Sequence, residues 1–133
     1  MTSFQIVALY TALALLLNVP LMLRVGRGRL AKKINLGDGG DADMIARVRA
    51  HGNFIENAAL SLIALFALAM LNGSQVMMHI LGSAFIIGRV LHALGMAGKF
   101  GQGRLIGTLL TLLFYIVSGL YILYLAFFAF GPV

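Results

Sequence analysis

The sequence predicts an all-α membrane protein, a bundle of four transmembrane helices. Of its 133 residues, 61% are hydrophobic and 11% are charged, which is more apolar surface than a soluble domain of this size needs. Four apolar stretches each reach the roughly 20 helical residues that a hydrocarbon core of about 30 Å requires. Basic side chains gather between these stretches, as they do in the cytoplasmic loops of membrane proteins. We expect a single domain that covers residues 1–133.

The first predicted span covers residues 4–23. Its start lacks the cationic region of a secretory signal peptide, and arginines rather than a small-residue cleavage site follow its apolar run. We therefore expect a retained helix. Near its end, Asn18 is expected to satisfy backbone carbonyls that Pro20 leaves free.

The second predicted span covers residues 53–71 and continues a helix that begins before the membrane. A loop is expected from Arg24 to about Asp41, because residues 37–40 are rich in glycine and typical of a turn. After this loop, Asp41 or Asp43 can cap the helix.

The third and fourth spans are predicted at residues 76–96 and 105–130. The fourth is longer than the membrane requires, so we expect it to tilt or to project at one end. Both helices carry small residues four positions apart, which let helix backbones approach closely in lipid. These pairs are Ala84 with Gly88 and Gly103 with Gly107.

Basic residues predict the orientation of the bundle. Seven of them lie between the first and second spans: Arg24, Arg27, Arg29, Lys32, Lys33, Arg47 and Arg49. Lys99 and Arg104 lie between the third and fourth spans, whereas the termini and the turn at residues 72–74 carry no basic side chain. The positive-inside rule then places both basic loops in the cytoplasm and both termini on the opposite side. The net charge of +6 is explained by this topology and by attraction to anionic membrane lipid, so no nucleic-acid partner is predicted.

Polar side chains within the spans are the main sign of a functional site, because ionisable groups inside a membrane are expensive. On the second helix, Arg49, Asn53 and Glu56 share one face through their i, i+4 and i+7 spacing. Arg89 and His92 share a face of the third helix. The fourth helix begins near Arg104 and continues along a polar stripe of Thr108, Thr111, Tyr115 and Ser118. At 1.5 Å per residue, all three sets reach one layer in the cytoplasmic third of the membrane.

Simpler structural interpretations remain open for several of these residues. Arg104 could extend to lipid head groups, and Arg89 could form an interhelical ion pair with Glu56. The polar stripe of the fourth helix could serve hydrogen bonding between helices. His51 and His79 are expected at the membrane interfaces rather than as ligands, and no metal site is predicted.

Several arginines around one carboxylate suit a ligand that is mostly anionic but carries one ammonium group. The tripeptide glutathione has this pattern, with two carboxylates, one amine and a thiol. The chain itself has no cysteine, so any thiol chemistry must use a thiol that a substrate brings.

Two runs of the sequence resemble a known family. The run from Arg49 to Asn57, RAHGNFIEN, resembles the signature of the membrane-associated proteins in eicosanoid and glutathione metabolism, the MAPEG family. The run Gly88-Arg89-Val90-Leu91-His92, followed by Gly98-Lys99 and Arg104, is similar to its third and fourth helices. The resemblance implies a homotrimer with active sites between subunits. The glycines at 37–40 are similar to those of its smaller bacterial, glutathione transferase-like members, which implies a bacterial inner-membrane protein.

The resemblance also implies roles for individual residues. The positions implied to hold glutathione are Arg29, Arg49, Asn53, Glu56, Arg89 and His92. Arg104 is implied to be the catalytic residue that stabilises the glutathione thiolate. Two positions depart from the family pattern. Met96 stands where several enzymes have a tyrosine, and Gly52 stands where some have a further arginine.

The leading functional hypothesis is an enzyme, a glutathione-dependent transferase or peroxidase that acts on lipophilic electrophiles. Glutathione is then the cosubstrate, and the electrophile enters from the bilayer along an apolar groove beside the fourth helix. One alternative is a non-catalytic protein of the same family that binds lipid or glutathione. A second is a small four-helix multidrug exporter, for which Glu56 lies too close to the cytoplasmic face.

Overall fold

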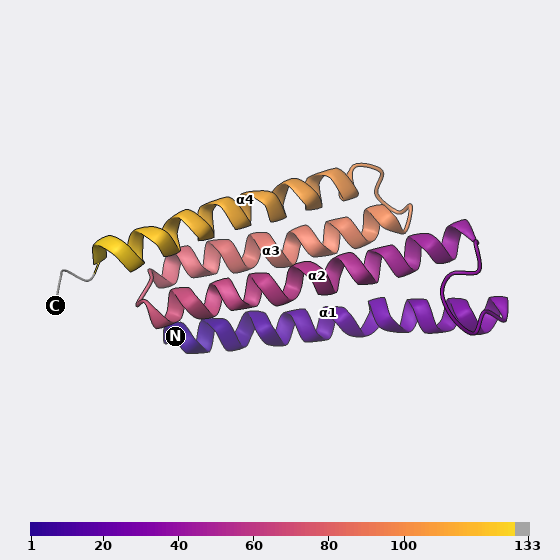
Figure 1. Cartoon of the computed structure of the whole chain (residues 1–133), viewed down its shortest axis with the longest axis horizontal. Coiled ribbons are helices and arrows are strands. Elements are labelled where there is room, and N and C mark those ends of the chain that lie inside the picture. Colours follow the sequence, from indigo (N-terminus) through magenta and orange to yellow (C-terminus); the bar gives the residue numbers. More distant parts are fainter. Residues whose placement is uncertain (130–133) are drawn as a thin grey trace.

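Four long helices make up most of the chain in a computed structural model that describes residues 1–129 (Figure 1). They are α1 (Ser3–Lys32), α2 (Ala42–Met70), α3 (Gln75–Met96) and α4 (Gly103–Tyr124), and α4 continues into one π-helical segment, η1 (Leu125–Ala129). Each of the four is long and apolar enough to cross a membrane. The fold class predicted from the sequence is therefore confirmed for a single chain. Position 130 of the predicted fourth span and residues 131–133 of the predicted domain lie outside the described residues.

The helices run alternately up and down, so that each is antiparallel to the next (Figure 1). Helix α1 packs on α2 and α3, and α4 packs on α3 and α2. The N-terminus, the end of η1 and the α2–α3 turn lie at one end of the bundle, whereas the α1–α2 loop and the α3–α4 turn lie at the other (Figure 1). The two basic loops thus share one end. The side of the membrane that this end faces stays a prediction.

Helix α1 is longer than the sequence predicted. It runs for 30 residues to Lys32, so the loop that was expected from Arg24 begins only at Lys33. The reason is tertiary packing: a Cβ at Gly28 would come within 2.5 Å of the Met44 sulfur and 3.1 Å of Arg47, so α2 supports this part of α1. Lys33 then ends the helix in the left-handed conformation, with φ of 57°. A helix of about 45 Å exceeds a hydrocarbon core of about 30 Å, so one end of α1 extends beyond the lipid.

The partner of Asn18 also differs from the prediction. Its Oδ1 lies 3.1 Å from Nε2 of His51 on α2, whereas it was expected to satisfy carbonyls near Pro20. Pro20 lies inside an uninterrupted α1. The Asn18 side chain therefore links α1 to α2 and does not bond to backbone carbonyls near Pro20.

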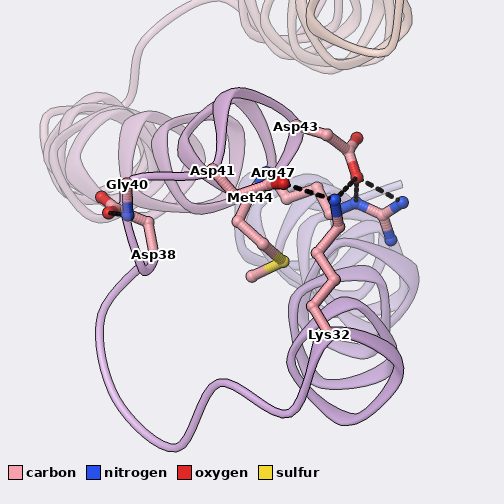
Figure 2. A network of polar contacts seen from close by, with 7 residues as sticks. All are labelled: Lys32, Asp38, Gly40, Asp41, Asp43, Met44 and Arg47. Atoms are coloured by element: carbon pink, nitrogen blue, oxygen red, sulfur yellow. Dashed lines mark hydrogen bonds and ion pairs between the residues drawn. The ribbon is translucent and has the colours of Figure 1, made fainter.

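The start of α2 is held to the end of α1 by ion pairs (Figure 2). Asp41 is the N-cap, and its Oδ1 accepts from the Met44 N–H at 2.9 Å, which confirms one of the two predicted caps. Lys32 reaches from α1 to the other Asp41 oxygen at 2.7 Å, and Arg47 donates to Asp43 at 2.9 Å. The Lys32 ammonium, aided by the Met44 N–H, holds the pKa of Asp41 below its ordinary value. Arg47 does the same for the pKa of Asp43.

Glycines bring α3 and α4 together. A Cβ at Gly107 would collide with the carbonyl oxygen of Gly88 and would lie 2.7 Å from His92. A Cβ at Gly103 would collide in the same way with the carbonyl oxygen of Leu91. Three of the small residues predicted to pack helices, Gly88, Gly103 and Gly107, therefore lie at the contact between α3 and α4.

At the opposite end, side chains tie the helices around a mostly apolar core. Tyr10 of α1 donates to the His79 carbonyl at 2.9 Å and lies 2.8 Å from Ser83 Oγ. The Tyr121 hydroxyl on α4 accepts from the Ser74 N–H at 2.8 Å, which fastens the α2–α3 turn. These contacts fix the rotation of the helices on which the candidate site depends.

Candidate functional site

Arg89 is the centre of the polar layer. Its side chain is buried, with 3% of the residue exposed, and it contacts both α2 and α4. Nη1 donates to Asn53 Oδ1 of α2 at 2.6 Å, and Nη2 donates to the Gly107 carbonyl of α4 at 2.8 Å and to the Thr111 hydroxyl. Nε is buried without a hydrogen-bond partner. One side chain of α3 thus joins the polar positions of three helices.

The three groups that accept hydrogen bonds from Arg89 are all neutral. Among residues 1–129 the ion pairs lie at the α1–α2 loop, where Lys32 and Arg47 meet Asp41 and Asp43. The ion pair between Arg89 and Glu56, considered as a structural alternative, does not form within the described chain, and Glu56 is exposed on α2. The buried guanidinium therefore has no counter-charge among residues 1–129.

A second hydrogen-bonded link continues from Asn53 to α4. Asn57 Nδ2 donates to the Asn53 carbonyl at 2.7 Å, and the Tyr115 hydroxyl donates to Asn57 Oδ1 at 2.9 Å. Two members of the predicted stripe, Thr111 and Tyr115, thus make interhelical hydrogen bonds. The other two bond within α4, because Thr108 donates to the Arg104 carbonyl and Ser118 to the Phe114 carbonyl.

These side chains surround a small polar pocket. Its volume is about 170 Å³, and its lining residues come from α2, α3 and α4: Asn53, Asn57, Arg89, Thr108, Thr111, Leu112 and Tyr115. Sites for drug-sized ligands usually enclose about 300 to 1,000 Å³. One chain thus offers room for a small polar group rather than for a whole tripeptide.

An apolar groove continues from this pocket between α2 and α4. It has a volume of about 330 Å³, and its lining side chains are mostly aliphatic: Leu60, Ile63, Ala64, Ala67, Tyr115, Ser118, Gly119 and Ile122. Tyr115 lines both spaces. The pocket and the groove therefore adjoin at this residue.

Three of the predicted site residues gather in one place. Asn53 and Arg89 are hydrogen-bonded to each other, and His92 is buried against Gly107, one turn along α3. This part of the predicted polar layer therefore exists within a single chain.

The other predicted site residues lie at the surface of the chain. Arg49, Glu56 and Arg104 are exposed. Arg29 is partly exposed near the end of α1, where its Nε donates to the Gly37 carbonyl at 3.1 Å. Within residues 1–129, the side chains of these four residues form no hydrogen bond or ion pair with Arg89 or Asn53. Their roles in binding and catalysis stay predictions.

Sequence reasoning placed Thr111 and Tyr115 in the polar layer, but it assigned no binding role to them or to Asn57. A signal was present for Asn57, because its spacing of four from Asn53 places both amides on one helix face. The pairing of Tyr115 with Asn57 depends on how α4 rotates against α2, which spacing along one helix does not determine.

Comparison with known proteins agrees with this arrangement. The model of the MAPEG family matches residues 7–124. The chain belongs to the MAPEG family. Its curated relatives include the inner membrane protein YecN of Escherichia coli K12, 29% identical over 97 residues that cover 73% of this chain and 74% of YecN. The protein of the same name from Escherichia coli O6:H1 strain CFT073 matches equally. No solved structure gives a significant match.

Membership confirms the resemblance noted in the sequence. This MAPEG protein is an integral membrane protein, as its four apolar helices and an inner-membrane relative both indicate. At the level of the family, it is a membrane protein of glutathione-related or eicosanoid metabolism.

Proposed function

We propose that this MAPEG protein is a glutathione-dependent transferase or peroxidase that acts on lipophilic electrophiles from the bilayer. The observation that carries the proposal is the polar pocket around Arg89, which adjoins an apolar groove at Tyr115. A water-soluble thiol peptide and a lipid-soluble electrophile need such neighbouring compartments. Family membership supplies the thiol class.

The peptide extends from the small pocket, which Asn53 and Arg89 line, along exposed charges near the basic end of the bundle. Arg49 and Glu56 are seven residues apart on α2 and are both exposed. The carboxylates of glutathione pair with arginines and its amine pairs with Glu56. The proposed glutathione-holding set is Arg29, Arg49, Asn53, Glu56, Arg89 and His92.

A second and a third copy of the chain would complete this site. An exposed carboxylate within the apolar part of α2 is expensive if lipid surrounds it. A homotrimer in which neighbouring subunits cover the charged face of α2 removes this cost and closes a pocket that is too small in one chain. Glu56 and Arg49 would then lie between subunits.

Arg104 is proposed to hold the thiolate. It occupies the first turn of α4, whose N-cap, Gln102, makes no side-chain hydrogen bond to the helix. Backbone N–H groups of a first helical turn lack helical acceptors and favour an anion. A permanent cation beside them favours the ionised form of a thiol, and reaction with a bound electrophile then requires only orientation.

Calorimetric titration of the purified protein with glutathione tests the proposal. Glu56→Gln and Arg49→Leu should each weaken binding, because each leaves one charge of the ligand unpaired. Arg27→Leu is a matched control, since Arg27 is an exposed basic residue outside the proposed set. Glutathione-dependent turnover of generic electrophiles should accompany binding. Unchanged affinity in both variants would remove these residues from the site.

A binding protein without turnover is the second candidate. Two positions favour it, because Met96 and Gly52 lack the tyrosine and arginine donors of several enzymes in the family. A Cβ at Gly52 would meet nothing within 4 Å, so this space is open in one chain. Glutathione binding without conversion of any electrophile would identify this candidate.

A further inference from the structure

Three polar side chains, Tyr10, His79 and Ser83, form a cluster near the start of α3, at the end of the bundle opposite the basic loops (Figure 1). The Tyr10 hydroxyl oxygen lies 2.9 Å from the His79 carbonyl oxygen, 3.2 Å from His79 Nδ1 and 2.8 Å from Ser83 Oγ. Tyr10 is buried, whereas His79 is half-buried and Ser83 is exposed. His79 follows Gln75, the first residue of α3, by about 6 Å along the helix axis. The cluster therefore lies at the depth of a membrane interface.

The single hydroxyl proton of Tyr10 determines the direction of all three contacts. A carbonyl oxygen can only accept a hydrogen bond, so the proton of Tyr10 goes to the His79 carbonyl. The other two contacts are then donated to the Tyr10 oxygen, one by Nδ1–H of His79 and one by the Ser83 hydroxyl. In a neutral imidazole that carries its proton on Nδ1, Nε2 is an acceptor.

Two acceptors of the cluster therefore have no donor. Among residues 1–129, the hydrogen bond of the His79 side chain is made by Nδ1, and Nε2 has none. Ser83 has given its one proton to Tyr10, and its oxygen keeps a lone pair for a further donor. A purely structural link between α1 and α3 explains the contacts of Tyr10, but it leaves these two acceptors unused.

The cluster forms the polar end of a groove between α3 and α4. The groove has a volume of about 510 Å³, within the range of about 300 to 1,000 Å³ for small-molecule sites, and its lining residues are His79, Ile80, Ser83, Ala84, Ile87 and Leu110. Four of these six side chains are aliphatic and none is acidic. From His79 to Ile87 the groove follows α3 for about 12 Å. Its polar end thus lies at the interface, and its apolar end lies within the hydrocarbon region.

We propose that this groove binds a single-chain lipid alcohol, whose hydroxyl donates to His79 Nε2 and whose chain lies along the aliphatic side chains. The head group has to be a donor, because the free groups of the cluster only accept. It has to be neutral, because an ammonium would find no counter-charge in the lining. A carboxylate has no proton to donate.

This site is separate from the polar pocket around Arg89. Arg89 follows His79 by ten residues on α3, or about 15 Å along the helix axis. None of the six lining residues belongs to the set proposed to hold glutathione. The inference therefore stands or falls independently of the proposed transferase function.

Nitrogen NMR of the full-length protein in lipid nanodiscs, with isotope-labelled histidine rings, tests the protonation of His79. The chain has three histidines, and the signals that His79→Gln removes are those of His79. In the free protein the ring should carry its proton on Nδ1, with Nε2 unprotonated. A neutral ring protonated on Nε2 would overturn the proposal, because the acceptor would be absent.

Two probes of equal chain length test the ligand chemistry. Decan-1-ol, added to the nanodiscs, should shift the Nε2 signal of His79 and reach saturation. Its methyl ether, 1-methoxydecane, has the same chain without a hydroxyl proton, and it should bind about fivefold more weakly, as expected for one neutral hydrogen bond. Equal affinity for the ether would overturn the proposal. So would tighter binding of decylammonium or decanoate than of the alcohol.

Two isoleucine variants test whether the groove holds the chain. Ile87→Phe should abolish the shift that decan-1-ol causes, because the larger side chain fills the apolar end of the groove and leaves the imidazole in place. Ile87 is 53% exposed, so the protein can accommodate the change. Ile116→Phe is the matched control, at a position of α4 that is 51% exposed and outside this groove, and it should bind the alcohol as the wild type does. Unchanged affinity in Ile87→Phe, or no saturable shift in the wild type, would overturn the proposal.

Discussion

Arg89 on α3 and Asn53 on α2 are joined by a 2.6 Å hydrogen bond from Nη1 to Oδ1, within the apolar part of the bundle. Asn53 thereby satisfies one donor of a cation that has no carboxylate partner in the described chain. This contact links α2 to the pair formed by α3 and α4.

Removing the Asn53 amide should destabilise the protein. Asn53→Ala leaves one N–H of Arg89 without its acceptor, and an unsatisfied buried donor costs about 1 to 3 kcal/mol. Denaturant unfolding in detergent measures the change. Asn35→Ala, at an exposed loop position, should stay within about 0.5 kcal/mol of the wild type. Equal stability of Asn53→Ala and wild type would show that the contact contributes little.

A methyl group at Gly107 should separate α3 from α4. The new Cβ would collide with the Gly88 carbonyl and with His92, and such overpacking costs about 1 to 3 kcal/mol. Gly119→Ala is the control on the same helix, because its Cβ would meet nothing within 4 Å. Alanine favours a helix by up to about 1 kcal/mol relative to glycine, so this variant should be neutral or more stable. Thermal unfolding of both variants provides the measurement. A Gly107→Ala variant as stable as the wild type would contradict the close contact between α3 and α4.

Acid should weaken the connection between α1 and α2. Lys32, and then the Met44 N–H, lower the pKa of Asp41 from 3.8 in the folded protein. The contribution of these two contacts to the free energy of unfolding is therefore fully present above pH 3.8. It is lost as the pH falls through the lowered pKa that Asp41 has in the folded protein. Asp41→Asn keeps a capping side chain but loses the charge.

The variant should accordingly be less stable than the wild type at pH 7, and the difference should shrink as the pH falls below 3.8. It should also shrink at high salt, because salt screens exposed ion pairs. Unfolding monitored by circular dichroism across pH provides the measurement. A difference that is independent of pH would assign the effect to the cap alone.

Arg104 should matter more for the ionisation of the thiol than for binding of the peptide. A cysteine thiol in solution has a pKa of about 8.5, and each unit of lowering corresponds to about 1.4 kcal/mol. In Arg104→Leu, bound glutathione should titrate closer to its solution value, as followed by ultraviolet thiolate absorbance at saturation. Lys99→Leu, at the other basic residue between α3 and α4, is the control. Identical titrations of Arg104→Leu and wild type would reduce Arg104 to a head-group anchor.

Cysteine labelling should establish the orientation. The sequence contains no cysteine, so a single introduced thiol gives an unambiguous signal. Leu36→Cys lies in the α1–α2 loop and Gln75→Cys starts α3 at the other end, and both positions are exposed. A membrane-impermeant maleimide applied to intact cells should label Gln75→Cys and spare Leu36→Cys. The reverse pattern would invert the topology that the basic loops predict.

The sequence by itself determined the four membrane-crossing helices and the common end of the two basic loops. Apolar stretches of sufficient length have one stable form in lipid, a helix that satisfies its own backbone hydrogen bonds. The packing role of Gly103 and Gly107 was equally accessible, because small residues four apart on one helix are a local pattern. That Gly107 meets Gly88 of α3 came only from the tertiary structure. The family could also be predicted from the sequence, because the runs of residues that resemble it, one in α2 and one across α3 and α4, are local patterns.

Only the tertiary structure decided which polar groups meet. Spacing places Asn53 and Glu56 on one side of α2, but it does not fix the rotation of α2 against α3. Because of that rotation, Asn53 accepts a hydrogen bond from Arg89, whereas Glu56 lies at the surface. Asn18 likewise reached His51 on α2 rather than a carbonyl of its own helix. The length of α1 depended on α2 packing against Gly28. Each of these outcomes depends on contacts between residues far apart in the chain, and helix periodicity carries no information about them.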